Sequence, residues 1–277
     1  MDKNQTLRIS SKWVHAGIAL LAILLISNCA FAARIGKYTS LEVAFDAPDT
    51  SVELVGYISF PPAYKKIDGL PPLVVLLHQE TETSAAWNTF REELLQTGHA
   101  VFAMDLRGHG LSTFDLKANR VRTKNTYMVG EQLKFPDDID FLVNKAISLH
   151  GDKIDTSRIA VIGADIGGTA GLIYAQHDKR VKYICLVSPG MEFQGLRIMP
   201  VLREFDKRPI TLISSDKDVY SMGSIDLITD LLPQRFDVFI VESMFHGNRL
   251  VNSSVPLRTK ILQDLNKYLA KTQEKAN

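Results

Sequence analysis

The chain has 277 residues, of which 45% are hydrophobic and 23% are charged, and its formal net charge is +1. This length and composition are typical of a globular protein with a sizeable core. The near-neutral charge gives no electrostatic reason to expect nucleic acid or an anionic membrane surface as a partner.

The first 32 residues have the pattern of a secretory signal peptide. Basic residues precede an apolar stretch from about Ala16 to Ile26, and Ala30-Phe31-Ala32 offers a small-x-small cleavage site. The stretch is shorter than the roughly 20 residues that a spanning helix needs, which disfavours an uncleaved anchor. Lipid attachment at Cys29 is the alternative, but Asn28 fits such processing poorly. We expect an exported protein, periplasmic or secreted, with no membrane contact beyond this leader.

Cleavage after Ala32 would leave a single domain over residues 33–277. It would remove three basic residues and one acidic residue, which changes the net charge from +1 to −1. Cys185 would then be the remaining cysteine, in an apolar run, so we expect a packing thiol and no internal disulfide.

Two segments early in the mature chain alternate apolar and polar residues, which predicts an antiparallel hairpin at the sheet edge. Longer apolar runs follow, separated by helical patterns. The hairpin covers 41–46 and 52–60, the expected strands are 73–78, 100–105, 158–162, 181–188, 210–214 and 236–241, and the expected helices are 84–97, 137–150, 169–177 and 257–270. Such an α/β sheet carries its ligand site where loops leave the carboxyl ends of the strands.

The strand that ends near Ile162 runs into Gly163-Ala164-Asp165-Ile166-Gly167-Gly168. The glycines let the backbone turn sharply into the next helix, as in a nucleophile elbow, but an aspartate stands where a serine is expected. Asp165 would therefore sit at the tip of the turn and point into a site.

Two later strands each end in a loop with a functional side chain. Asp216 and Asp218 follow the strand over 210–214, and His246 follows the strand over 236–241. The chain order is thus elbow residue, acid, histidine, which is the order of a hydrolase triad. Strand-end spacing favours Asp218 over Asp216 as the acid that would orient the imidazole of His246.

The loop Asp105-Leu106-Arg107-Gly108-His109-Gly110-Leu111-Ser112, placed between a strand ending in His78 and the elbow, resembles the α/β-hydrolase superfamily. The stretch from about 52 to 270 is most similar to the cap-less, dienelactone-hydrolase-like or small-esterase branch. The resemblance implies a mostly parallel central sheet with helices on both faces. It also implies a catalytic set of Asp165, Asp218 and His246, with oxyanion-hole amides from Gln79 and Ile166, while His109 and Arg107 belong to the scaffold.

The sequence departs from the family at two points, Asp165 and the loop 79–83, which contains no glycine and carries two carboxylates. An aspartate that attacks an ester carbonyl would give an unstable anhydride, whereas attack on a saturated carbon gives an alkyl ester that water can hydrolyse. Haloalkane dehalogenases and epoxide hydrolases resemble this elbow. Their lid is missing here, because only about twenty residues separate Gly190 from Ile210, and Ile166 follows the aspartate where dehalogenases have a tryptophan.

Two functions remain open at this point. One is an exported hydrolase of a small uncharged substrate with an Asp165-Asp218-His246 site, and the other is an inactive binding or interaction protein on a hydrolase scaffold. The histidines at 99, 150 and 177 lack partners at metal-ligand spacing, so neither a metal nor another cofactor is expected. The sequence does not fix the oligomeric state.

Overall fold

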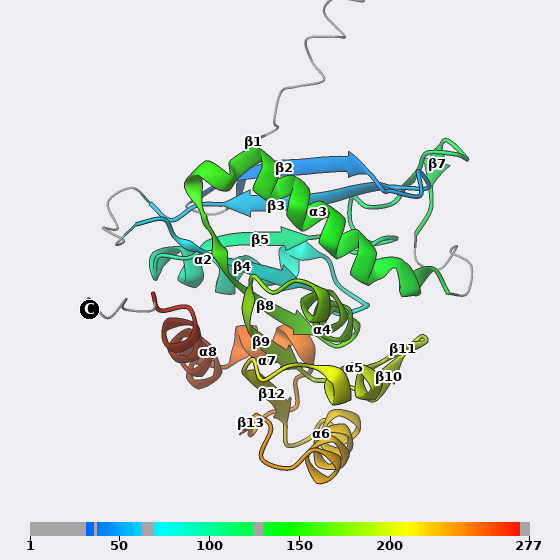
Figure 1. Ribbon diagram of the computed structural model, residues 1–277. Coiled ribbons are helices and arrows are strands. Elements are labelled where there is room, and N and C mark those ends of the chain that lie inside the picture. Colours follow the sequence, from blue (N-terminus) through cyan, green and yellow to red (C-terminus); the bar gives the residue numbers. More distant parts are fainter. Residues whose placement is uncertain (1–31, 36–37, 63–68, 124–129, 272–277) are drawn as a thin grey trace, which may run out of the picture. The chain divides into compact units, whose positions relative to one another are not determined.

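The centre of the fold is a nine-stranded sheet (Figure 1). The computed structural model describes residues 32–35, 38–62, 69–123 and 130–271. The strand order is β1-β2-β3-β5-β4-β8-β9-β12-β13. The strands from β5 to β13 pair in parallel, whereas β1, β2 and β3 pair antiparallel. The predicted fold class, a mostly parallel sheet with an N-terminal antiparallel hairpin, is confirmed.

The strands of the sheet are β1 (Ala32–Ile35), β2 (Tyr38–Asp46), β3 (Glu53–Ser59), β4 (Pro72–Leu77), β5 (Ala100–Met104), β8 (Asp155–Ala164), β9 (Val181–Val187), β12 (Ile210–Ser215) and β13 (Asp237–Val241). The α-helices are α2 (Asn88–Gln96), α3 (Phe135–His150), α4 (Ile166–His177), α5 (Ile198–Glu204), α6 (Val219–Leu231), α7 (Gly247–Ser253) and α8 (Val255–Tyr268). Short 3-10 turns cover η1 (Ser84–Trp87), η3 (Glu131–Lys134) and η4 (Gly151–Lys153), and two small hairpins pair β6 (Phe114–Asp115) with β7 (Arg120–Val121) and β10 (Glu192–Phe193) with β11 (Leu196–Arg197).

Helices cover both faces of the sheet because the central strands are apolar on both sides. In β4, Leu73, Val75 and Leu77 pack into one core and Val74 and Leu76 into the other. The first core contains buried side chains of α3, α4, α5 and α6, and the second contains those of α2, α7 and α8. The sheet is thus rigid where its strands end at the site.

The structure differs from the sequence prediction at the two edges of the sheet. β1 pairs with β2, so the predicted hairpin β2–β3 is not the outermost pair. At the other edge, β13 exposes Val238 and Ile240 by 39% and 38%. The predicted helix 84–97 begins with the 3-10 turn η1 instead, and α6, which follows Asp218 directly, was not predicted.

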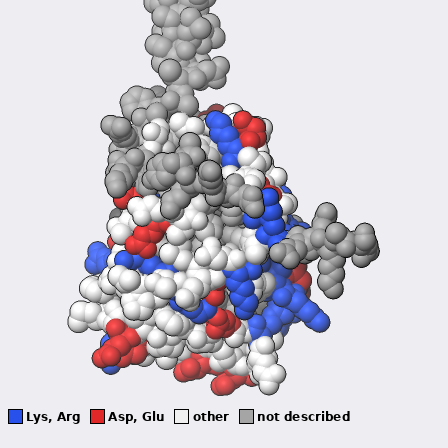
Figure 2. Space-filling model, turned by 90° about the vertical axis from the view of Figure 1, so that its left-hand side faces the viewer, with Lys and Arg blue, Asp and Glu red and all other residues white. Residues whose placement is uncertain are grey.

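Contacts divide the chain into Met1–Phe31 and Ala32–Asn277. The predicted signal peptide over 1–32 lies outside the described residues except for Ala32, which belongs to β1. Among the helices of the described segments, none has the length and apolar character needed to cross a membrane. On the face drawn in Figure 2, acidic and basic side chains occur near one another with uncharged areas between them.

Candidate active site

Asp165 occupies a strained turn between β8 and α4. Its φ is +55° and its ψ is −126°, a region that side-chain-bearing residues rarely adopt. The turn packs tightly on its neighbours, because a Cβ on Gly167 would lie 2.3 Å from the carbonyl oxygen of His78 and one on Gly163 would lie 2.5 Å from Gly168 Cα. The glycines therefore allow the turn to lie against the end of β4, with Asp165 at its tip.

The carboxylate of Asp165 faces two backbone amides. Its Oδ2 accepts a hydrogen bond from Glu80 N at 3.3 Å, and the N–H of Ile166 also faces the carboxylate. Burial, above all, raises the pKa of Asp165 above 3.8, and the Glu80 carboxylate adds to the rise. The two amides and His246 offset part of this effect. A carboxyl oxygen thus occupies the place where an oxyanion would be stabilised.

His246 and Asp218 form the pair expected from the sequence. The Nδ1 of His246 lies 2.6 Å from Asp218 Oδ2, and because a carboxylate only accepts, Nδ1 donates in this bond. Asp218 also accepts from Ser221 N at 3.2 Å as the N-cap of α6. Burial alone would raise the pKa of Asp218, but the bonds from His246 and Ser221 outweigh it and lower the pKa.

Asp216, the alternative acid, is engaged elsewhere. Its carboxylate accepts from Ser243 N at 2.9 Å and from Lys217 Nζ at 2.7 Å. Within the part of the chain that the structure describes, His246 Nε2 has no hydrogen-bond partner. Nε2 is therefore free to accept a proton, and Asp165 is near enough for the imidazole to affect its pKa.

The structure directs the amide of Gln79, the predicted oxyanion-hole donor, to Asn248 and not to Asp165. Gln79 N donates to Asn248 Oδ1 at 3.0 Å, and Asn248 N donates to Gln79 Oε1 at 2.9 Å. This reciprocal pair joins the loop after β4 to the start of α7 and removes Gln79 N from the site. The amide of the next residue, Glu80, donates to Asp165 instead.

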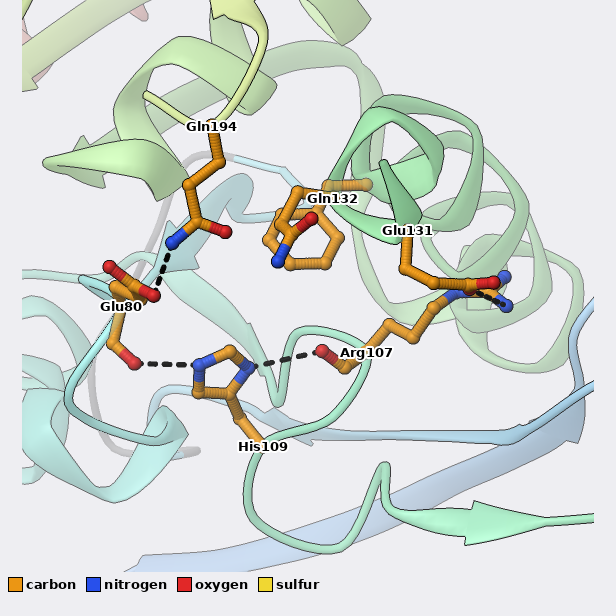
Figure 3. Close-up of a pocket in the computed structure, with 7 residues that line it drawn as sticks. Glu80, Arg107, His109, Glu131, Gln132 and Gln194 are labelled. Atoms are coloured by element: carbon orange, nitrogen blue, oxygen red, sulfur yellow. Dashed lines mark hydrogen bonds and ion pairs between the residues drawn. The ribbon is translucent and has the colours of Figure 1, made fainter. Parts of the chain in front are cut away.

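Two histidines hydrogen-bond to carbonyl groups of the loop that carries Glu80. His78 Nδ1 donates to Gln79 O at 2.7 Å, and His78 Nε2 accepts from Leu106 N at 2.9 Å. His109 Nε2 lies 2.6 Å from Glu80 O, and its Nδ1 lies 3.1 Å from Arg107 O (Figure 3). These contacts fix the peptide planes of a loop that lacks glycine, so that the Glu80 N–H points at Asp165.

A small hairpin that the sequence reading missed reaches the same loop. Gln194 Nε2 donates to the Glu80 carboxylate from the turn between β10 and β11 (Figure 3). Both central residues of that turn have positive φ, +48° at Gln194 and +92° at Gly195, as a type I′ turn requires. The Gln-Gly dipeptide before Leu196 is the signal that could have predicted it.

The cavity drawn in Figure 3 lies beside Glu80 and is small, with a volume of about 10 Å³. Its walls include Glu80, His109, Gln132 and Gln194. Over the described segments, no three His, Cys, Asp or Glu side chains are grouped so that they could hold a metal ion.

The raised pKa of Asp165 predicts a pH-dependent effect on stability. The folded chain binds this proton more tightly than the unfolded chain, so the wild type loses stability as the pH rises from 3.8 through the raised pKa. Asn does not titrate, yet its Oδ1 can still accept from the Glu80 N–H. We expect urea unfolding to show that Asp165→Asn is more stable than the wild type at neutral pH and that the difference shrinks on acidification. A difference that stays constant across this window would contradict the prediction.

Residues 72–217 match the family model described as alpha/beta hydrolase fold. Among curated proteins, the chain is 28% identical over 204 residues to the alpha/beta hydrolase pydG of Acremonium sp and 26% identical over 180 residues to the alpha/beta hydrolase xenA of Xenoacremonium sinensis. These matches cover 68% and 62% of this chain but 43% and 38% of those proteins. The chain therefore spans about two fifths of the length of the curated relatives it matches.

Two solved structures have a similar fold. The Pyrococcus furiosus esterase Pf2001 matches with a TM-score of 0.64 and 16% identity, over 84% of this chain and 94% of that chain. The dienelactone hydrolase of Anabaena variabilis matches with a TM-score of 0.61 and 14% identity, over 84% of this chain and 97% of that chain. At these identities the likeness concerns the fold.

Proposed function

The chain belongs to the α/β-hydrolase fold family, and from this premise we propose that it is a hydrolase that displaces a leaving group from a saturated carbon. In this proposal Asp165 is the nucleophile, His246 is the base and Asp218 orients the base. The observation that supports it is the bond from Glu80 N to Asp165 Oδ2, together with the Ile166 N–H that faces the same carboxylate.

The first step uses the carboxyl oxygen that the amides leave free. Asp165 Oδ1 attacks the substrate carbon, a carbon–oxygen bond forms, and the leaving group departs with the electrons of the broken bond. From an alkyl halide it leaves as a halide ion, and from an epoxide it is an alkoxide that takes a proton from water. The product is an alkyl ester of Asp165. Oδ2 becomes the carbonyl oxygen of this ester and remains beside the Glu80 amide.

The second step is hydrolysis of that ester. His246 Nε2 takes a proton from water, and the water oxygen attacks the ester carbonyl carbon. Negative charge then develops on Oδ2, where the Glu80 amide stabilises it. The bond between the carboxyl carbon and the alkyl oxygen breaks, His246 returns the proton to the departing alcohol, and Asp218 stabilises the imidazolium in between.

Ester substrates fit this arrangement less well. A substrate carbonyl would need the two amides that the Asp165 carboxylate already occupies, and acyl transfer to Asp165 would yield an anhydride. We therefore propose uncharged substrates that carry an electrophilic saturated carbon, such as epoxides or alkyl halides.

An isotope experiment tests the proposal. Enzyme in excess over a terminal epoxide is allowed one turnover in water labelled with oxygen-18. The proposed route puts the label into the Asp165 carboxylate and leaves the first diol unlabelled, because the added diol oxygen comes from Asp165. Mass spectrometry of the peptide that contains Asp165 reads this directly. Label in the first diol with none in Asp165 would contradict the covalent route.

A second candidate function is binding without turnover. It is favoured by the Asp165 carboxylate, which already accepts the Glu80 N–H that an oxyanion would need. It predicts saturable binding of neutral molecules with no product from epoxides, alkyl halides, lactones or esters. Detection of an alkyl adduct on Asp165 would eliminate it.

A further inference from the structure

A series of hydrogen bonds connects the loop of Asp165 and Glu80 with the β10–β11 hairpin and with α6. On one side, Asp165 is bonded to Glu80, and the Glu80 carboxylate accepts from Gln194 in the β10–β11 turn. The same hairpin reaches α6, because Tyr220 OH donates to Glu192 O at 2.9 Å and the Tyr220 ring packs edge-on against Phe193 at 5.9 Å.

The loops of Asp218 and His246 connect α6 back to the loop that carries Glu80. Tyr220 lies two residues after Asp218, which binds His246. Asn248, two residues after His246, forms two hydrogen bonds with Gln79, the residue before Glu80. The Asp218–His246 and Gln79–Asn248 contacts thus join the loops that carry the proposed site residues.

The segments joined by these contacts differ in the polarity of their side chains. Glu80 and Gln194 present a carboxylate and an amide (Figure 3). The segments next to Asp218 and His246 carry four exposed apolar side chains, which we name the apolar rim: Val219 at 83% exposure, Met244 at 83%, Tyr220 at 52% and Phe245 at 42%. Val219 directly follows Asp218, and Phe245 directly precedes His246.

Exposed apolar side chains grouped around a polar site indicate a bound apolar surface rather than ordinary surface variation. The two loops that bear the rim are tied together at their catalytic residues by the 2.6 Å bond between His246 and Asp218.

We infer that the substrate is a neutral amphiphile with an extended apolar chain that lies on the apolar rim and a small polar head that faces Glu80 and Gln194. This inference rests on the proposed function for the position of the reacting carbon. An anionic head is disfavoured because the Asp165 and Glu80 carboxylates would both repel it. The chain stays partly in contact with water, since the rim is an open surface.

Binding without turnover tests this inference. Calorimetry on the full chain measures the affinity for 1,2-alkanediols of six, eight and ten carbons, which are the hydrolysis products of terminal epoxides. We expect affinity to rise about two-fold per added methylene, roughly half of what full burial of each methylene gives. Decanoate, with a similar chain and an anionic head, should bind at least about ten-fold more weakly than the ten-carbon diol.

Matched variants locate the effect. Val219→Ser with Met244→Ser removes two rim side chains that are 83% exposed and should flatten the dependence on chain length. Leu231→Ser with Val238→Ser removes exposed apolar side chains from the far end of α6 and from β13 and should leave it unchanged. Affinity independent of chain length, or an equal loss in both double variants, would overturn the inference.

The same data separate the inference from the proposed function. A chain-length dependence carried by the rim, without epoxide turnover, supports the amphiphile site and counts against catalysis. Turnover of short epoxides with no chain-length dependence supports catalysis and overturns the amphiphile site.

Discussion

Asp165→Asn is expected to lower turnover of a neutral alkyl substrate by about a million-fold, which corresponds to roughly 8 kcal/mol of transition-state stabilisation. The amide of Asn is a poor nucleophile, so no alkyl ester forms. The substitution preserves the acceptor for the Glu80 N–H, and Asn has nearly the same size and shape as Asp, so the strained backbone of this turn is not changed. Steady-state assays of product formation measure the loss.

Two further variants show whether such a loss belongs to Asp165 as a nucleophile. Asp226→Asn neutralises an exposed carboxylate on α6 and should keep full activity. Asp165→Ala should match Asp165→Asn, and it cannot regain an aspartate by deamidation. Activity of Asp165→Ala within about a hundred-fold of the wild type would rule out a covalent role, since loss of a nucleophile costs far more.

The opposite effects of Asp165→Asn on stability and on turnover have one cause. Burial and the Glu80 carboxylate disfavour the charged form of Asp165, as its raised pKa indicates. The attacking form is the carboxylate, so the fold is destabilised by the same charge that the reaction needs. A residue kept only for structure would be better served by an uncharged side chain.

The sequence predicted the sheet well because its central strands are apolar runs between helical patterns and its N-terminal hairpin alternates apolar and polar residues. It also predicted the pairing of Asp218 with His246, since loops at the carboxyl ends of the neighbouring strands β12 and β13 must lie close together. The choice of Asp218 over Asp216 followed from the same spacing.

The parts that the sequence did not predict depend on contacts between distant side chains. Glu80 supplies the amide because Asn248, 169 residues after Gln79, binds Gln79 N. No local pattern encodes that pairing. The apolar rim was also missed, because Val219 and Met244 are residue types that usually lie in a core. Only the backbone reveals that they are exposed beside the triad.

His246→Gln is expected to stop the reaction after its first step. Alkylation needs only Asp165, whereas hydrolysis of the alkyl ester needs a base, and Gln cannot take a proton from water at neutral pH. The alkyl ester on Asp165 should therefore accumulate to about one per chain, and mass spectrometry of the intact protein and of the peptide that contains Asp165 detects it.

The adduct separates the two functions more decisively than loss of activity does, because an inactive binding protein also lacks turnover but forms no bond to its ligand. His177→Gln, at an exposed histidine at the end of α4, should turn over normally and carry no adduct. The double variant Asp165→Asn with His246→Gln should also carry none, since it has no nucleophile. An adduct on Glu80 instead of Asp165 would move the nucleophile to the loop after β4, and an unmodified His246→Gln protein that still binds substrate would leave binding as its function.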